Sequence, residues 1–316
     1  MSRWLRILGS IAAVCGCIVF IGYMAMSLRP QDLAGHLTPA LAASLVIATL
    51  LSTLVIPIGS WSWKVLLDDL GHRTPYRTLN AIMLTTQAGK YLPGNVGQHF
   101  GKAALALAHG VPSAPLFISM AYELVLLLMA SCVVGISLGL VSGAALDILG
   151  SGHGKRLIWL GIGLVAALAA IPLLLRLVNW AVHKLIARNG RAPAQRTSKA
   201  GIAAVTSVVA IDGCAYLVSG LAFTLLAMAL APEQHPGYLY LTAAYAIAWT
   251  VGFVVPGAPA GVGVRESILL MLLSRQMPGA DASLLVLAQR IATTLADILC
   301  FAAGAFIMAR IRRSKQ

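Results

Sequence analysis

The chain has 316 residues, of which 59% are hydrophobic and only 10% are charged, and its mean hydropathy is +0.85. This composition lies outside that of soluble globular proteins and predicts an integral membrane protein. The net charge of +13 does not indicate a nucleic-acid partner, because the cations cluster between hydrophobic runs and at the chain ends, where cytoplasmic loops carry them.

Two apolar runs open the chain, Ile7–Leu28 and Thr38–Trp63. Each has about 20 residues or more, enough to cross a bilayer. The first follows Arg3 and Arg6, so we expect the N-terminus in the cytoplasm. The second should bring the chain back there, because it ends in a charged cluster of Lys64, Asp68, Asp69, Arg73 and Arg77.

A helix-breaking stretch, GKYLPGNVGQHFG, follows at Gly89–Gly101. The apolar run Leu79–Leu92 is too short to cross and stops at Pro93, which lacks an N–H and has a fixed φ. A second short helix is predicted over Val96–His109. Together the two short helices predict a re-entrant hairpin with its tip at Pro93-Gly94.

Three further spans are predicted, Leu116–Val141, Leu157–Leu177 and Gly201–Ala231. A loop with six cations and no acid precedes the third span, and the positive-inside rule places it in the cytoplasm. These cations are Arg176, Lys184, Arg188, Arg191, Arg196 and Lys199. The link Pro232–Gly237 has no Lys or Arg and should face the periplasm.

A second helix-breaking stretch, GFVVPGAPAGVGVRE, starts at Gly252 and ends the apolar run Tyr238–Val255. A short helix, Arg265–Gln276, and a final span, Ser283–Ala309, complete the chain. Seven full spans would leave the basic tail outside the cell. We therefore expect Pro256–Met277 to complete a crossing, which gives about eight transmembrane helices, two of them broken or re-entrant.

The chain is predicted to be a single all-α integral membrane domain with a possible two-fold repeat, of halves 1–155 and 156–316. Gly89-x-x-x-Pro93-Gly94 in the first half corresponds to Gly252-x-x-x-Pro256-Gly257 in the second. Interrupted apolar segments at matching places of two halves are typical of a transporter's midplane site. Chance is the alternative, since the chain has 30 Gly and 14 Pro.

The ionisable residues inside or beside the apolar runs are four acids and four cations, so their charges balance. An ionised side chain at the centre of a lone membrane helix costs roughly 2.5–3.5 kcal/mol, so such residues normally face a bundle interior or a wet cavity and find partners. A structural polar clamp is the alternative for the acids. We expect a charge network across helices, with Arg290 and Asp212 as one candidate pair. The residues of this expected network are Glu123, Asp212, Arg290 and Asp297. The other four ionisable residues in or beside the apolar runs are Lys90, Lys102, Arg265 and Glu266.

Lys90 and Arg265 stand beside the two helix breaks, where free amides and helix N-termini also attract anions. A cation next to free amides suits a phosphate, whereas Lys102 could instead snorkel to the membrane interface. The candidate substrate-binding residues are Lys90, Pro93, Gly94, Gly97, Lys102, Pro256, Gly257, Gly261, Gly263, Arg265 and Glu266.

Both stretches resemble signatures of a known family. Gly89–Gly97, with Lys90 where Arg is common and a basic residue five positions after Gly97, resembles the first signature of the lysylphosphatidylglycerol synthase transmembrane-region family. Pro256–Glu266 is similar to the second signature, a PG-x-x-G-x-GVRE type run. The resemblance implies a multi-pass protein of the bacterial inner membrane, related to the flippase portion of enzymes that make and translocate aminoacylated phosphatidylglycerol.

We therefore expect a translocator for a phospholipid or glycolipid rather than an enzyme, since no nucleophile motif or aspartate pair is found and no loop is long enough to fold an aminoacyltransferase domain. The alternatives are a membrane subunit or an anchor for a lipid-modifying enzyme or a glycosyltransferase. No cofactor or metal is expected, because the five cysteines and seven histidines lack ligand spacing. The sequence leaves the lipid and the oligomeric state open.

Overall fold

The computed structural model describes residues 38–91, 97–144, 176, 180, 200–255, 261 and 263–313. Within these residues the chain is helical and has no strand, as predicted. The elements are α3 (Pro39–Asp69), α4 (Tyr76–Thr86), the 3-10 helix η1 (Gln87–Tyr91), α5 (Gly97–Ala108), α6 (Ser113–Ser142), α9 (Ile202–Leu230), α10 (Tyr238–Val254), α11 (Val264–Leu273) and α12 (Gly279–Arg313). The predicted span Ile7–Leu28, and Leu157–Leu177 apart from Arg176, lie outside the described residues, as does the boundary between the two predicted halves.

Four helices, α3, α6, α9 and α12, are long and apolar enough to cross a membrane. They have 31, 30, 29 and 35 residues. At about 1.5 Å per residue each exceeds the ~30 Å hydrocarbon core of a bilayer. Large apolar side chains such as Leu50, Leu54, Phe301 and Phe306 are exposed on them. Long helices with exposed apolar faces identify a multi-pass membrane protein.

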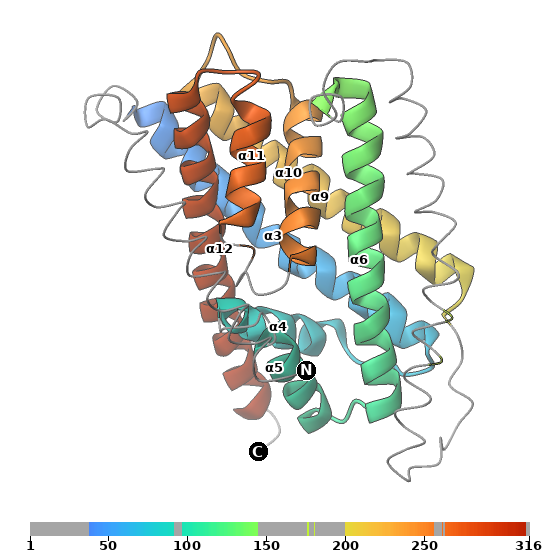
Figure 1. The fold of residues 1–316 in the computed structure, drawn as a ribbon. Coiled ribbons are helices and arrows are strands. Elements are labelled where there is room, and N and C mark those ends of the chain that lie inside the picture. The colour runs from blue at the N-terminus through green and yellow to red at the C-terminus, as the bar shows by residue number, and fades with distance from the viewer. Residues whose placement is uncertain are drawn as a thin grey trace, which may run out of the picture.

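The helices form one bundle in which the short helices occupy opposite ends (Figure 1). α6 and α12 run along its length, while α3 and α9 pack against each other and cross it obliquely. α10 and α11 lie in the upper half of the view, and α4 and α5 lie at the lower end. The end of α3 is tied to the start of α9, because the Gly201 N–H donates to Asp69 Oδ2 at 2.7 Å.

Small residues allow two pairs of helices to approach closely. A Cβ added to Gly220 of α9 would lie 1.9 Å from Thr242 Oγ1 of α10. A Cβ added to Gly304 of α12 would lie 2.5 Å from the Thr85 nitrogen of α4. Such contacts are characteristic of membrane helices, which gain little from burying apolar surface and associate through close packing.

Pro57 interrupts the hydrogen bonding of α3 and is compensated by neighbouring helices. Because proline has no N–H, the Thr53 carbonyl loses its partner within the helix. The Cys300 thiol of α12 donates to that carbonyl at 3.7 Å. The Tyr76 hydroxyl donates to the Pro57 carbonyl at 3.0 Å. The bond from Cys300 replaces the one that Pro57 cannot donate, which makes the proline tolerable in an apolar environment.

The first interrupted segment folds as two short helical pieces, α4 with η1 and then α5, close to the predicted ranges Leu79–Leu92 and Val96–His109. η1 and α5 touch through backbone, since a Cβ on Gly89 would lie 2.5 Å from the Gln98 nitrogen. Only glycine permits this approach. The predicted hairpin tip, Pro93-Gly94, lies outside the described residues.

The second interrupted segment corrects the expected path of the chain. α10 descends from the upper end, α11 leads back to that end alongside α10, and α12 then starts there (Figure 1). α11 has 10 residues and spans only about 15 Å. The described residues of this predicted crossing, 261 and 263–277, therefore do not carry the chain to the opposite end. α12 alone makes that passage, which puts the basic end of α12 at the same end of the bundle as α4 and α5.

Candidate functional site

A cavity of about 270 Å³ lies among the helices, and residues from α3, α4, η1, α5, α6, α9, α10, α11 and α12 line it. Its wall is mixed: apolar residues such as Val55 and Leu127 alternate with ionisable ones. Seven of the eight charged residues predicted for the membrane interior line it: Lys90, Lys102, Glu123, Asp212, Arg265, Arg290 and Asp297. The eighth, Glu266, contacts one of them. Residues scattered over more than 200 positions of sequence thus meet at one site.

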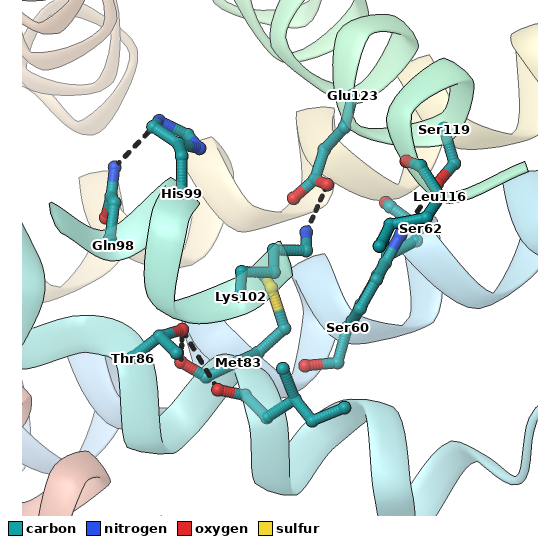
Figure 2. Close-up of polar contacts among 12 residues, drawn as sticks. Ser60, Ser62, Met83, Thr86, Gln98, His99, Lys102, Leu116, Ser119 and Glu123 are labelled. Carbon is teal, nitrogen blue, oxygen red and sulfur yellow. Dashed lines mark hydrogen bonds and ion pairs between the residues drawn. The ribbon is translucent and has the colours of Figure 1, made fainter. Parts of the chain in front are cut away.

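The first group of charges, which we call the acidic half, consists of Lys102, Glu123 and Asp212. Lys102 of α5 forms an ion pair with Glu123 of α6 (Figure 2). The Lys102 ammonium also lies 3.9 Å from the centroid of the Trp63 ring, and its residue is only 4% exposed. Lys102 is therefore a buried member of the site and does not snorkel.

Asp212 of α9 is the carboxylate without an ion-pair partner in this half. The Ser62 hydroxyl donates to Asp212 Oδ1 at 2.6 Å. The other oxygen, Oδ2, is buried and has no hydrogen-bond partner among the described residues. Asp212 is 2% exposed and interacts electrostatically with both Glu123 and Lys102. This half thus has two carboxylates and one lysine, which pairs with Glu123.

The second group, the basic half, consists of Lys90, Arg265, Glu266, Arg290 and Asp297. Lys90 Nζ of η1 lies 2.6 Å from Asp297 Oδ1 of α12. Arg290 Nη1 of α12 lies 3.2 Å from Glu266 Oε1 of α11. α12 therefore holds both interrupted segments, one through a cation and the other through an anion seven residues away.

Glu266 also shapes the start of α11. Its Oε2 accepts a hydrogen bond from the Gly263 N–H at 2.7 Å, which satisfies a backbone donor at the helix N-terminus. Gly263 has φ +86°, a left-handed conformation that favours glycine. One carboxylate thus fixes both the turn into α11 and the position of Arg290.

Arg265 is the cation without a carboxylate partner among the described residues. Its guanidinium carbon lies 4.4 Å from the centroid of the Tyr245 ring. Glu266 and Asp297 act on it electrostatically, but they form their own pairs with Arg290 and Lys90. Arg265 therefore lines the cavity as the cation most available to an anionic ligand.

The structure separates the predicted binding residues into three groups. Gly261 lines the cavity together with Lys90, Lys102 and Arg265. Gly97 starts α5, Gly263 precedes α11 and Glu266 accepts from the Gly263 N–H, so these three shape the backbone beside the cavity. Four predicted residues, Pro93, Gly94, Pro256 and Gly257, lie outside the described residues. The predicted Arg290–Asp212 pair is wrong, because Arg290 pairs with Glu266.

An aromatic wall was missed by the sequence analysis. Tyr216 of α9 and Tyr245, Trp249 and Phe253 of α10 line the cavity. The Trp249 and Phe253 rings are stacked with centroids 5.0 Å apart, and Tyr216 meets Trp249 edge-on at 5.6 Å. The three α10 residues recur every four positions, which places them on one helix face. That spacing, next to a helix break, is the signal that could have revealed the wall.

Among the described residues, no group of three or more His, Cys, Asp and Glu side chains could hold a metal ion. His99 lines the cavity but contacts Gln98, with 3.3 Å between their Nε2 atoms (Figure 2). The cavity wall offers charged groups, hydrogen-bonding groups and aromatic faces to a ligand.

The fold and the cavity define a class: multi-pass helical membrane proteins whose interrupted helices border a charged internal cavity. The family model for the lysylphosphatidylglycerol synthase TM region matches residues 4–300. The chain belongs to this family, as its two signatures predicted. A comparison with curated proteins finds no match.

Proposed function

We propose that the protein translocates a membrane lipid, phospholipid or glycolipid, across the bacterial inner membrane. The observation that carries this proposal is one cavity that every described helix borders and that seven charged residues line, with an eighth, Glu266, paired to one of them. Ionisable groups in membrane segments normally mark a substrate or ion pathway. Membership in a family of lipid-synthase membrane regions supports a lipid as that substrate.

We further propose that both interrupted segments are re-entrant and that they enter from opposite faces of the membrane. α10 with α11, and α4 with η1 and α5, occupy opposite ends of the bundle (Figure 1). Residues of both segments line the same cavity. This arrangement is typical of transporters whose site lies where two interrupted segments meet near the midplane.

The lipid phosphate is proposed to bind in the basic half. Arg265 is the primary contact, because its charge is not taken by a described carboxylate. Lys90 assists, since it lines the cavity beside Asp297. Neutralisation by a guanidinium lowers the cost of moving an anion through an apolar core. The acyl chains remain in the surrounding lipid, and the proposal assigns no chemical step to the chain.

The end of the bundle that holds α4 and α5, the lower end in Figure 1, is proposed to face the cytoplasm. The N-terminus, which lies outside the described residues, is also proposed to be cytoplasmic, because Arg3 and Arg6 precede the first apolar run. Exposed Arg73 precedes α4 there, and Arg310 and Arg313 end α12 at that end. The link Pro232–Gly237 would then be periplasmic. A cysteine introduced at Gln234 should react with an impermeant thiol reagent in intact cells, whereas one introduced at Arg73 should not. The reverse pattern would contradict this orientation.

Reconstitution in liposomes with fluorescent lipids tests the function. The purified chain should move labelled phospholipid between leaflets without any added enzyme. Arg265→Gln should reduce the rate by at least about tenfold, as expected for loss of a charge-assisted contact. Arg275→Gln is the matched control, because Arg275 is an exposed arginine just after α11. A folded protein that moves no lipid would reject translocation and favour the anchoring role.

A further inference from the structure

We infer that Asp212 is a proton-binding site and that each negatively charged head group crosses the membrane together with one proton. A pH gradient would then drive the movement of the lipid. This inference rests on the proposed function and adds an energy source to it. It follows from the surroundings of Asp212 and from the balance of charge around the cavity.

Asp212 has one carboxylate oxygen that is free to take a proton. Oδ1 accepts a hydrogen bond from the Ser62 hydroxyl at 2.6 Å. Oδ2 is buried and has no hydrogen-bond partner among the described residues, while the residue lines the cavity. Lys102, the cation of this half, forms an ion pair with Glu123 instead. A proton on Oδ2 therefore removes a buried charge that no described cation pairs with, and it leaves an O–H donor at the cavity.

A proton fits this oxygen better than a metal ion does. A metal cation requires several ligands around it, and no group of three or more His, Cys, Asp and Glu side chains in the described part of the chain could supply them. A proton requires a single oxygen. Water in the cavity can deliver it to Oδ2 and accept it again, so no other reactant is needed.

The charges around the cavity balance before any ligand enters. The described charged residues are four cations and four carboxylates, counting Glu266 with the seven that line the wall. A phosphate at Arg265 adds one negative charge, which is costly in a site that is largely shielded from water. A proton on Asp212 restores the balance. Tyr216 interacts electrostatically with both Asp212 and Arg265, so the two ligands occupy one connected site.

The other charged groups around Asp212 already have partners. On α3, Ser62 contacts Asp212, whereas Lys64 and Asp68 pair with each other away from the cavity wall. His99 is the rival proton site, because a histidine of the wall titrates closest to neutral pH. The charged side chains that the other helices place on the wall are Lys90, Lys102, Glu123, Arg265, Arg290 and Asp297, and the tyrosines are Tyr216 and Tyr245. All of these charged residues except Arg265 belong to ion pairs.

Proton uptake during lipid binding tests the site directly. A short-chain phosphatidylglycerol, with one negative charge, would be titrated into the purified protein in weakly buffered detergent solution that contains a pH indicator. We expect uptake of about one proton per lipid bound, and an affinity that falls by up to about tenfold for each unit of rising pH. Binding without proton uptake and without this pH dependence would overturn the inference.

Asp212→Asn locates the proton. Asparagine is neutral and keeps an oxygen that accepts from Ser62, so this variant should bind the lipid without proton uptake, and at high pH at least as tightly as the unaltered protein. Weaker binding at high pH, or retained proton uptake, would overturn the assignment to Asp212.

Two variants serve as controls for this substitution. Asp68→Asn is the matched control, because Asp68 Oδ1 is also buried without a described hydrogen-bond partner but Asp68 does not line the cavity. His99→Gln removes the rival proton site. Both should take up protons like the unaltered protein, and loss of uptake in His99→Gln would place the proton on His99 and overturn the inference.

Transport in liposomes tests the coupling. Trace fluorescent phosphatidylglycerol should accumulate in the leaflet that faces the alkaline side, by up to about tenfold per pH unit. A potassium diffusion potential should not change this distribution, since a proton and an anion together carry no net charge. Liposomes without protein give the background.

The outcomes of this transport experiment separate the two proposals. Lipid that moves but responds to the membrane potential, or to neither gradient, would overturn proton coupling and leave translocation standing. If no lipid moved under any condition, translocation itself would fail, and the coupling with it.

Discussion

Each half of the cavity contains ion-paired residues and one charged residue without an ion-pair partner, but that residue is a cation in the basic half and a carboxylate in the acidic half. In the basic half, the carboxylates of Glu266 and Asp297 each pair with a cation across helices, and Arg265 is the charge left over. In the acidic half, Lys102 pairs with Glu123, and Asp212 is the charge left over. The paired residues hold the helices together, and the unpaired residue of each half is available to a ligand. Removing a paired residue should therefore destabilise the fold, whereas removing an unpaired one should impair function.

The largest effect is expected for Glu266→Gln. Glu266 is 2% exposed, and its loss leaves Arg290, whose side chain is only 19% exposed, without its partner. Breaking a buried ion pair in this way costs about 3–5 kcal/mol. Thermal unfolding of the purified protein in detergent should show a large decrease in Tm. Glu233→Gln is the control, because Glu233 is exposed in the link before α10.

A double-mutant cycle sharpens this prediction. Arg290→Gln combined with Glu266→Gln should be less destabilising than the sum of the two single substitutions, since the double variant leaves no lone buried charge. Arg290→Gln combined with Asp212→Asn should be additive within about 0.5 kcal/mol. Strong coupling of Arg290 to Asp212 would contradict the division into two halves.

An intermediate effect is expected from the corresponding glycines of the two interrupted segments. Gly89→Ala should cost about 1–3 kcal/mol, because the new Cβ would lie 2.5 Å from the Gln98 backbone nitrogen. Gly252→Ala should cost less, below about 1 kcal/mol, since its nearest neighbour is the Arg265 Cβ at 3.2 Å. Unfolding of both variants in the same detergent gives the comparison. Equal losses of unfolding free energy would show that the two helix breaks are packed equally tightly.

The smallest effect on stability is expected for Arg265→Gln. This substitution breaks no described ion pair and removes one contact with the Tyr245 ring. The free energy of unfolding should change by less than about 1 kcal/mol, although lipid transport should fall sharply. A stability loss as large as that of Glu266→Gln would assign Arg265 a structural role.

Much of the site could be predicted from the sequence. Polar and charged residues stand out within apolar runs, and the cost of placing them in a membrane required that they meet partners or water. The helix breaks were evident from the positions of Gly and Pro. The aromatic wall was not predicted, because aromatic residues in an apolar helix carry no such cost and are common on lipid-facing surfaces as well.

The sequence by itself determined the class of protein, the apolar helices, the family and the set of residues that must be buried together, since each depends on local composition or on a short motif. The pairing of those residues was decided only by the tertiary structure. Arg265 and Glu266 are neighbours in sequence, but successive side chains on a helix point about 100° apart, so Arg265 lines the cavity and Glu266 pairs with Arg290 of α12. The path of α10 and α11 was likewise decided by packing, because a short apolar helix satisfies its own backbone hydrogen bonds whether it continues across the bundle or turns back.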